Sequence, residues 1–395
     1  MVAPSVLVVC GAGYVSGKEI MALELARGLV ANGHRVTFVT SSWSDGDFQA
    51  RLKSDGLNAA VLPIGFISAT MTWSCIRMTA EQLLRWPGLL LGYAGLLRRE
   101  RPSQVVHTNW HHLILLYPFL RPNRDSFWLH EVVPGSSRYG RLFRRLAQRL
   151  NCFICVSQAV GSSLLALDVE GEKVVVVPNG ISDPAGEMSL HHDEASLRRF
   201  GPLRVGIVGQ VGRWKGHDDL LDAASLLARE GLDFKVEIVG GGDEQYRLEL
   251  KERARRLGLE KFVQWRGVIR SKCDIYSGLD ICVVPSRFAE PFGLAALEPA
   301  FFEIPVVATN RGGLPEIVVD RQTGLLVDAE NPGQLAAALR ELINDRDLRT
   351  ALGRAGRRRA IGRFGIGRFA GKFSELLIAF ADQTMSGQTK LSGSP

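Results

Sequence analysis

The chain of 395 residues has little of what marks a membrane-spanning or secreted protein. Its nearest approach to a long apolar run, residues 83–97, contains Arg85 and Pro87 and is too short to cross a bilayer. The first residues, MVAPSVLVVC, carry neither a charged stretch nor a cleavage site and are typical of a first strand. We therefore expect a cytoplasmic protein without a leader peptide.

Metal-binding patterns are also scarce. Of six cysteines only Cys152 and Cys155 form a C-x-x-C pair, and these lie in an apolar strand pattern without the second pair that a zinc site needs. No Asp-x-Asp motif stands directly after an apolar strand. We predict reduced, buried thiols, no metal and no cofactor.

The net positive charge of the chain lies mainly in its first half. Residues 1–185 contain 18 basic and 13 acidic residues, whereas the remainder contains 30 and 28. This excess favours an anionic partner for the first half, either a membrane surface or a phosphorylated substrate. No nucleic-acid-binding motif is present, and we expect no nucleic-acid partner.

Apolar strand patterns alternate with helical periodicity in two series, which predicts an α/β protein with two parallel-sheet, Rossmann-like domains. Strands are predicted at 5–10, 35–41, 103–109, 125–133, 174–181, 203–209, 234–240, 262–267, 281–286, 305–310 and 324–328. The expected organisation is a first domain over 1–184, a linker over 185–202, a second domain over 203–365, a C-terminal helix over 366–382 that could return to the first domain, and a disordered tail over 383–395.

A glycine-rich loop follows the first strand. Gly11, Gly13 and Gly17 are spaced one residue too widely for a dinucleotide fingerprint, and no acidic residue ends the second strand. Ala12 and Glu19 occupy positions where a phosphate-binding P-loop needs Gly and Ser or Thr. We expect only that this backbone approaches a donor or an acceptor closely.

The stretch VVPSRFAEPFGLAALE, residues 283–298, combines a strand end, a turn and a short helix. It brings together Glu290, Glu298 and the backbone amides of Phe292, Gly293 and Leu294. Helix-terminal amides suit phosphate, and carboxylates accept hydrogen bonds from sugar hydroxyls. The alternative is a helix cap followed by an ordinary surface glutamate.

Two features of the first half allow two interpretations each. His130 ends a predicted strand and is either a site residue or a satisfied core histidine. Residues 138–149 contain five arginines, and the apolar positions Leu142, Phe143, Leu146 and Leu150 accompany them. This segment is either a packed surface helix with a solvated basic face or a helix that docks on an anionic membrane.

The second half resembles the retaining group 1 transferases of glycosyltransferase family 4, which have the GT-B fold. The similarity rests on the motifs IVGQVGRWKGHDDLLDA, IVGGGDE, FAEPFGLAALEPA, PVVATNRGGLPEIV and TGLLVDAENP, in this order. The first half is similar more loosely, through NGHRV, VVHTNW, WLHE, VSQAV and VVPNGI. The resemblance implies two domains facing a central cleft.

The resemblance also implies roles for particular residues. Glu290 and Glu298 correspond to the E-x7-E pair, which contacts the transferred sugar and the ribose. Lys215 corresponds to the lysine that neutralises the diphosphate, and the amides of 292–294 meet the sugar and diphosphate. His130 resembles the histidine of the first domain that faces the sugar.

Two departures from the family pattern affect these roles. Gln210 stands where the family has arginine, so a charge-assisted bond to phosphate becomes neutral unless Arg213 replaces it. Pro299 follows Glu298 directly and is expected to kink the helix, which either aims Glu298 or weakens its ribose contact.

The implied function is metal-independent transfer of a sugar, with retention, from a UDP- or GDP-linked donor. The implied acceptor is a saccharide or lipid-linked saccharide in cell-envelope polysaccharide or exopolysaccharide synthesis. Alternatives are a nucleotide-sugar 2-epimerase of the same fold and a non-catalytic nucleotide-sugar-binding protein.

Overall fold

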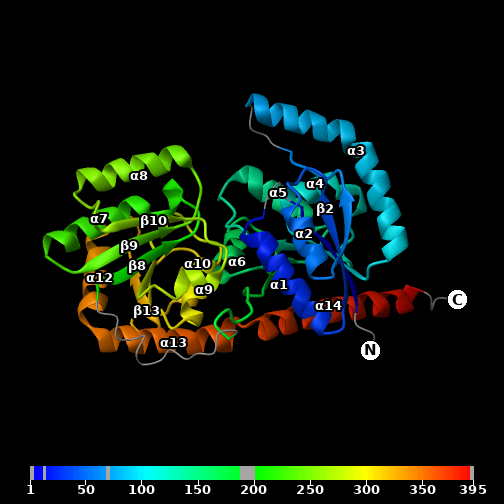
Figure 1. Ribbon diagram of the computed structural model, residues 1–395. Coiled ribbons are helices and arrows are strands. Elements are labelled where there is room, and N and C mark those ends of the chain that lie inside the picture. Colours follow the sequence, from blue (N-terminus) through cyan, green and yellow to red (C-terminus); the bar gives the residue numbers. More distant parts are fainter. Residues whose placement is uncertain (1–3, 12–14, 68–71, 187–200, 392–395) are drawn as a thin grey trace. The chain divides into compact units, whose positions relative to one another are not determined.

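The computed structural model describes residues 4–11, 15–67, 72–186 and 201–391, which form two α/β units (Figure 1). Unit 1 comprises residues 1–181 and 366–395, and unit 2 comprises residues 182–365. Each unit contains one sheet whose described strand pairs are all parallel. The predicted fold class of two Rossmann-like parallel-sheet units is thereby confirmed.

The described strands of unit 1 form a sheet in the order β3-β2-β1-β4-β5-β6-β7. The strands are β1 (Ser5–Val9), β2 (Arg35–Ser41), β3 (Asn58–Leu62), β4 (Gln104–His107), β5 (Asp125–Leu129), β6 (Phe153–Cys155) and β7 (Val174–Val176). The helices are α1 (Gly17–Ala31), α2 (Asp47–Ser54), α3 (Trp73–Glu100), α4 (Trp110–Leu115), α5 (Ser137–Ala147), α6 (Gln158–Leu165) and α14 (Ile366–Leu391), with short 3-10 turns η1 (Tyr117–Phe119) and η2 (Gly171–Lys173).

The described strands of unit 2 form a sheet in the order β10-β9-β8-β11-β12-β13. The strands are β8 (Leu203–Val208), β9 (Phe234–Val239), β10 (Val263–Gly267), β11 (Ile281–Val284), β12 (Val306–Thr309) and β13 (Gly324–Val327). The helices are α7 (His217–Arg229), α8 (Glu244–Arg256), α9 (Lys272–Tyr276), α10 (Leu294–Phe301), α11 (Leu314–Ile317), α12 (Pro332–Asn344) and α13 (Arg346–Phe364), with the 3-10 turn η3 (Arg213–Lys215).

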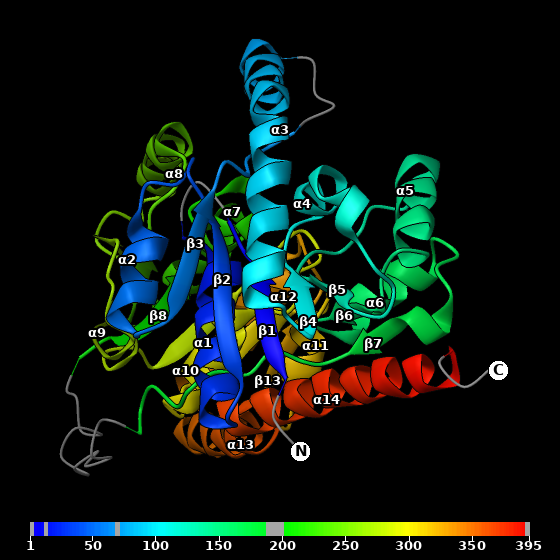
Figure 2. The ribbon, with the colours of Figure 1, turned by 90° about the vertical axis from the view of Figure 1, so that its right-hand side faces the viewer.

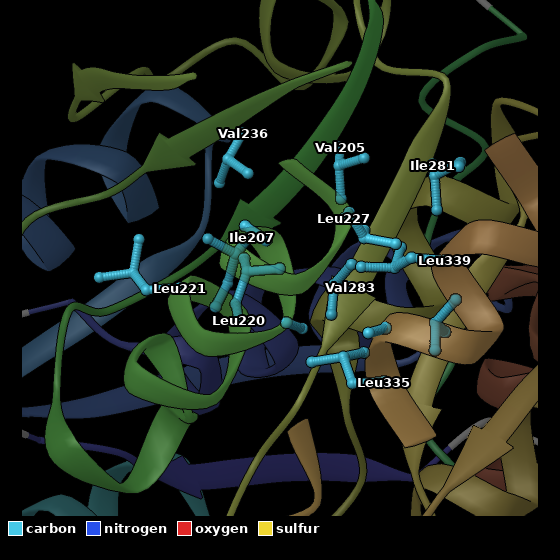
Figure 3. Packing of buried hydrophobic residues seen from close by; sticks show 14 of the residues in the cluster. Val205, Ile207, Leu220, Leu221, Leu227, Val236, Ile281, Val283, Leu335 and Leu339 are labelled. Carbon is cyan, nitrogen blue, oxygen red and sulfur yellow. The ribbon is translucent and has the colours of Figure 1, made fainter. Parts of the chain in front are cut away.

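The core of unit 2 lies between its sheet and the helices α7 and α12. Val205 and Ile207 of β8 and Val283 of β11 are almost fully buried with Leu220 of α7 and Leu339 of α12 (Figure 3). Because both faces of a parallel sheet are covered by helices, its strands are continuous apolar runs. This packed core fixes the strands, and the loops at their carboxyl ends carry the candidate site described below.

Helix α14 packs against α1 and β4 of the same unit (Figure 2). The ring of Trp128 lies 5.8 Å from that of Phe369 and 5.4 Å from that of Phe373, and His34 Nε2 lies 2.6 Å from Ser374 Oγ. The helix continues to Leu391, past the predicted end at residue 382, and the disordered tail over 383–395 stays a prediction. The predicted linker, 185–202, falls mostly on residues 187–200, which lie outside the described residues.

The apolar residues of the basic segment 138–149 are mostly buried. Phe143, Leu146 and Leu150 are at most 2% exposed, and the ring of Phe143 stacks on that of Phe127 at 6.4 Å. The segment is therefore packed as the interpretation of a surface helix expects, because most of its apolar stripe belongs to the core of unit 1. Its arginines form a polar outer face, on which Arg144 pairs with Asp168.

Candidate functional site

The central site residues of unit 2 follow two neighbouring strands, β8 and β11. The strand order reverses between these two strands, since β9 follows β8 on one side and β12 follows β11 on the other. Ligands of open α/β sheets bind outside the carboxyl ends of the strands at such a switch point. Lys215 follows β8, and Ser286 and Glu290 follow β11, so the topology brings them to one edge.

Lys215 and Glu290 form a partly buried ion pair. Lys215 Nζ donates to Glu290 Oε1 at 2.5 Å, and the side chains are 24% and 14% exposed. The Ser286 hydroxyl donates to the same oxygen at 2.6 Å, and the Thr309 hydroxyl donates to the Ser286 carbonyl at 2.8 Å. The backbone of Glu290 is fixed as well, because Gly313 N–H donates to its carbonyl at 2.7 Å. These hydrogen bonds hold the ammonium of Lys215 and the carboxylate of Glu290 side by side.

The two loops that carry this pair are bound to each other. Arg287 donates from Nε and Nη2 to the two carboxylate oxygens of Asp219, each at 2.8 Å, and its N–H donates to the Trp214 carbonyl at 2.8 Å. Gly216 has φ 73°, and a Cβ there would lie 1.9 Å from the Pro285 carbonyl oxygen. Glycine after Lys215 is thus required both by its left-handed backbone and by the close approach of the second loop.

Glu298 is positioned by the short helix α9. The Tyr276 hydroxyl donates to Glu298 Oε2 at 2.9 Å, and Lys272 Nζ lies 3.1 Å from Glu298 Oε1. Burial, followed by the nearby Glu298 charge, raises the pKa of Tyr276 well above its ordinary value, so the phenol keeps its proton. The carboxylate is 16% exposed, which leaves it accessible to a ligand.

Helix α10 continues through Pro299 to Phe301. Proline has no N–H to donate to the carbonyl four residues earlier, which is that of Ala295. The Cys282 thiol donates to this carbonyl at 3.9 Å, a weak bond that partly replaces the missing one. Pro299 therefore neither ends the helix nor separates Glu298 from its two partners.

The N-terminus of α10 lies directly after the Glu290 turn. Gly293, with φ 109°, precedes the first helical residue, Leu294, so the first amides of this helix are directed out of its N-terminal end. Phe292 is 3% exposed, and its ring contacts that of Phe364 at 5.7 Å. A ligand at this end would meet the backbone of Phe292 and not its side chain.

Arg213 is engaged away from the Lys215–Glu290 pair. Its Nη2 lies 2.5 Å from Glu249 Oε2, and its guanidinium lies 4.6 Å from the centre of the Tyr246 ring, both on α8. Gln210 is exposed in the loop after β8. The positive charge of Arg213 is thus compensated by Glu249, and Lys215 is the cation held beside Glu290.

The glycine loop of unit 1 leads into a capped helix. Ser16 N–H donates to Glu19 Oε2 at 2.9 Å, and Ser16 and Glu19 together form a capping box at the start of α1. A Cβ on Gly11 would lie 2.9 Å from the Ser41 backbone nitrogen, whereas Gly17 is the first residue of α1 and Gly13 lies outside the described residues. The S-x-x-E pattern of this capping box is present in the sequence. It explains why residue 19 is a glutamate and not the Ser or Thr of a P-loop.

His130 follows β5 at the same sheet edge as this loop, and its ring lies 4.2 Å from that of Trp128. Burial, and then the positive charge of Lys18, holds the pKa of His130 well below its ordinary value. Its Nε2 is buried without a hydrogen-bond partner among the described residues. A neutral imidazole with an unsatisfied nitrogen is suited to a hydrogen bond with a ligand hydroxyl, which the interpretation as a satisfied core histidine does not explain.

The structure thus brings Lys215, Glu290 and Glu298 to one region of unit 2, and it places His130 and the glycine loop in unit 1. The sequence reasoning missed Ser286, Tyr276 and Lys272, which hold the two carboxylates. The sequence pointed to them only through their positions, because Ser286 follows β11 and Lys272 and Tyr276 precede it. In the described part of the chain, no three His, Cys, Asp or Glu side chains are grouped so that they could hold a metal ion.

Two family models match successive parts of the chain. The model for glycosyltransferase family 4 matches residues 15–183, and that for group 1 glycosyl transferases matches residues 192–359. The D-inositol 3-phosphate glycosyltransferase of Corynebacterium jeikeium is 40% identical over 192 residues, which cover 45% of this chain and 45% of that protein. The chain thus spans about half the length of the first curated relatives it matches.

More distant proteins match over most of the chain. Glycogen synthase of Mycobacterium tuberculosis is 27% identical over 361 residues, which cover 85% of this chain and 84% of that protein. Among solved structures, Anabaena HepE in complex with UDP superposes with a TM-score of 0.77 at 19% identity, covering 95% of this chain and 100% of that one. Sucrose-phosphate synthase of Thermosynechococcus elongatus gives 0.75 at 20% identity, covering 97% and 100%. These structural matches establish the fold.

Proposed function

Since the chain belongs to the group 1 glycosyltransferases of family 4 and has their GT-B fold, we propose that it transfers a sugar from a nucleotide-sugar to an acceptor. The proposal includes retention of anomeric configuration and independence from metal ions. It places the enzyme in the synthesis of cell-envelope polysaccharide or exopolysaccharide, with a saccharide or lipid-linked saccharide as acceptor.

The observation that carries this proposal is the organisation of the two carboxylates at the switch point of unit 2. Each lies beside a lysine and accepts a hydrogen bond from a hydroxyl, Glu290 from Ser286 and Glu298 from Tyr276. Two ordered carboxylates close to a helix N-terminus suit a ligand that has hydroxyls at both ends and phosphates between them. A nucleoside diphosphate sugar has this chemistry.

The proposed mechanism follows from the charge that develops during transfer. Breaking the bond between the anomeric carbon and the phosphate oxygen leaves negative charge on the diphosphate. Lys215 and the first amides of α10 would stabilise this charge, and Glu290 would hold a hydroxyl of the transferred sugar. Without substrate, the ammonium of Lys215 is satisfied by Glu290 at 2.5 Å. When a donor binds, the diphosphate would then replace the Glu290 carboxylate as the stronger anionic partner of Lys215.

His130 is proposed to act as a hydrogen-bonding group toward the sugar. Its lowered pKa keeps the imidazole neutral near pH 7, so it can bond a hydroxyl without adding a positive charge next to the sugar ring. A cation at this place would oppose the positive charge that the ring gains as the bond breaks.

A uridine donor is the first to test. HepE, a structural neighbour, has been crystallised with UDP and with UDP-glucose, and its fold covers almost the whole chain. The acceptor cannot be taken from the curated relatives, because they match over about half of their length.

The experiment is a panel of UDP-, GDP- and ADP-sugars incubated with the full chain, with and without saccharide acceptors. Nucleotide release that depends on an acceptor supports transfer, and NMR of the product reports the anomeric configuration. Conversion of the donor to its 2-epimer would make the protein an epimerase, and binding without turnover would make it a binding protein. Glu290→Gln should abolish turnover, whereas Glu252→Gln, on the exposed side of α8, serves as the matched control.

A further inference from the structure

Helix α3 is anchored by one part of its surface and otherwise projects from unit 1. Leu89, Tyr93 and Leu96 are buried in the apolar cluster of this unit, together with residues of β1 and β4. Pro87 lies inside the helix, which bends along its length in Figure 1. Both views show its N-terminal part extending beyond the sheet of unit 1 (Figures 1 and 2).

The outer face of α3 carries large apolar side chains that unit 1 does not cover. Trp73 is 84% exposed, Leu84 83%, Leu91 77%, Leu83 55% and Ile76 39%. Their spacings of three, seven and eight residues place them along one side of the helix. Isolated exposed leucines are ordinary, but a contiguous apolar patch on a soluble protein marks an interaction site.

The same face is basic. Arg77 and Arg98 stand seven residues before Leu84 and seven after Leu91, on the same line along the helix. Including Arg101 directly after it, the helix has five arginines against two glutamates, and both glutamates pair with arginines of the helix itself. Apolar side chains bordered by arginines form the pattern of a helix that lies in a membrane interface, with the guanidinium groups at the level of the headgroups.

We propose that the outer face of α3 docks on an anionic bilayer surface. The apolar side chains would enter the boundary of the acyl chains, Trp73 would lie at the headgroup level, and the arginines would contact anionic lipid. Contact with a second copy of the chain is disfavoured because it would bring two basic faces together. No described helix is long and apolar enough to cross a membrane, so this contact is one with the surface.

The proposal transfers the membrane contact from α5 to α3. In α5 the apolar side chains Phe143 and Leu146 are in the core and the exposed arginines face outward, whereas α3 exposes both classes of side chain on one face. The inference is independent of the sugar chemistry proposed above, because it rests on residues remote in sequence from Lys215 and Glu290.

The test is flotation of the full chain with phosphatidylcholine vesicles, with and without about one quarter phosphatidylglycerol, over a range of salt concentrations. The parent should bind only the anionic vesicles and should be released as salt rises. Leu84→Ser with Leu91→Ser should weaken binding by about tenfold for each leucine, since each loses the transfer of its side chain out of water. Arg77→Glu with Arg98→Glu should abolish binding at low salt.

Matched controls separate this face from general effects. Leu248→Ser, on α8 and 51% exposed, and Arg141→Glu with Arg145→Glu, on α5, should bind like the parent. Tryptophan emission should shift to the blue with anionic vesicles, and Trp73→Phe should remove this shift. Unfolding temperature and UDP binding are measured for every variant, which separates a failure to fold and a failure of the donor site from a failure of docking.

Equal recovery from neutral and anionic vesicles, or parental binding by the Leu84 and Leu91 double variant, would overturn the proposal. Loss of binding through the α5 changes would do the same and would assign the contact to α5. If sedimentation shows a dimer that the leucine changes convert to a monomer, and vesicles bind neither form, a second copy covers this face and the membrane proposal is wrong.

Discussion

The carboxylate of Glu298 offers the sharpest test of the donor site, because nucleotide binding can be measured without knowledge of the acceptor. The perturbation is Glu298→Gln, which keeps the shape of the side chain and removes its charge. Tyr276→Phe is the companion change, since it keeps the carboxylate and removes the hydroxyl that donates to it at 2.9 Å.

The structure sets the size of the two effects. A hydrogen bond from a ribose hydroxyl to a carboxylate contributes about 1.5–3 kcal/mol, so Glu298→Gln should weaken UDP binding by roughly 10- to 150-fold. Tyr276→Phe should cost only several-fold, because Lys272 at 3.1 Å still holds the carboxylate. The Lys272 side chain is 28% exposed, and solvent screens its share of the network. The double variant should bind about as weakly as Glu298→Gln alone, since both changes act on one contact.

The assay is titration calorimetry with UDP and with GDP, accompanied by thermal unfolding of each variant. Glu252→Gln is the control for loss of a glutamate charge from the same unit. The reasoning is refuted if Glu298→Gln binds both nucleotides as the parent does. It is also refuted if Tyr276→Phe weakens binding more than Glu298→Gln while its unfolding temperature is parental, because the hydroxyl would then contact the ligand directly.

Four further predictions follow from the same geometry. Glu290→Ala should lower kcat for sugar transfer far more than it weakens UDP binding. Equal losses in kcat and in UDP binding would show that Glu290 does not contact the transferred sugar specifically. Activity should persist in EDTA, and recovery on adding magnesium or manganese after a loss would contradict metal independence. Arg213→Ala should change kcat/KM for the donor by less than about threefold, because the guanidinium of Arg213 is paired with an exposed glutamate. Gln210→Arg should raise kcat/KM for the donor. A large loss with Arg213→Ala and no gain with Gln210→Arg would show that Arg213 contacts the diphosphate. Gly216→Ala should destabilise unit 2 by at least about 2 kcal/mol, and Gly231→Ala, with a similar φ of 78° but open space at its Cβ, by only about 1 kcal/mol; calorimetry showing equal losses would exclude the steric argument.

Much of this molecule can be predicted from its sequence. Strand and helix periodicity specified the two parallel sheets, because a buried strand must be apolar along its whole length and a covering helix on one stripe. The E-x7-E spacing located Glu290 and Glu298, and the K-G pair located Lys215, since these motifs depend on short segments whose local geometry is set by glycine and by the start of a helix. The structure places Lys215 beside Glu290 and Lys272 beside Glu298, contacts between segments far apart in the sequence, and the roles of these residues toward a ligand stay a prediction.

Other features depended on elements that are far apart in the sequence. The basic segment 138–149 has the composition of an interfacial helix, but only the packing of Phe143 on Phe127 shows that its apolar stripe is core. Helix α3 has a comparable pattern, but Leu89 and Tyr93 are buried in the core of unit 1 while its outer stripe is left uncovered. Likewise, Arg213 pairs with Glu249 on α8, and Lys272 on α9 pairs with Glu298 on α10. Sequence periodicity identifies an apolar face but not what covers it, and charge identifies an ion but not its partner, because both are decided by contacts that exist only after the chain has folded.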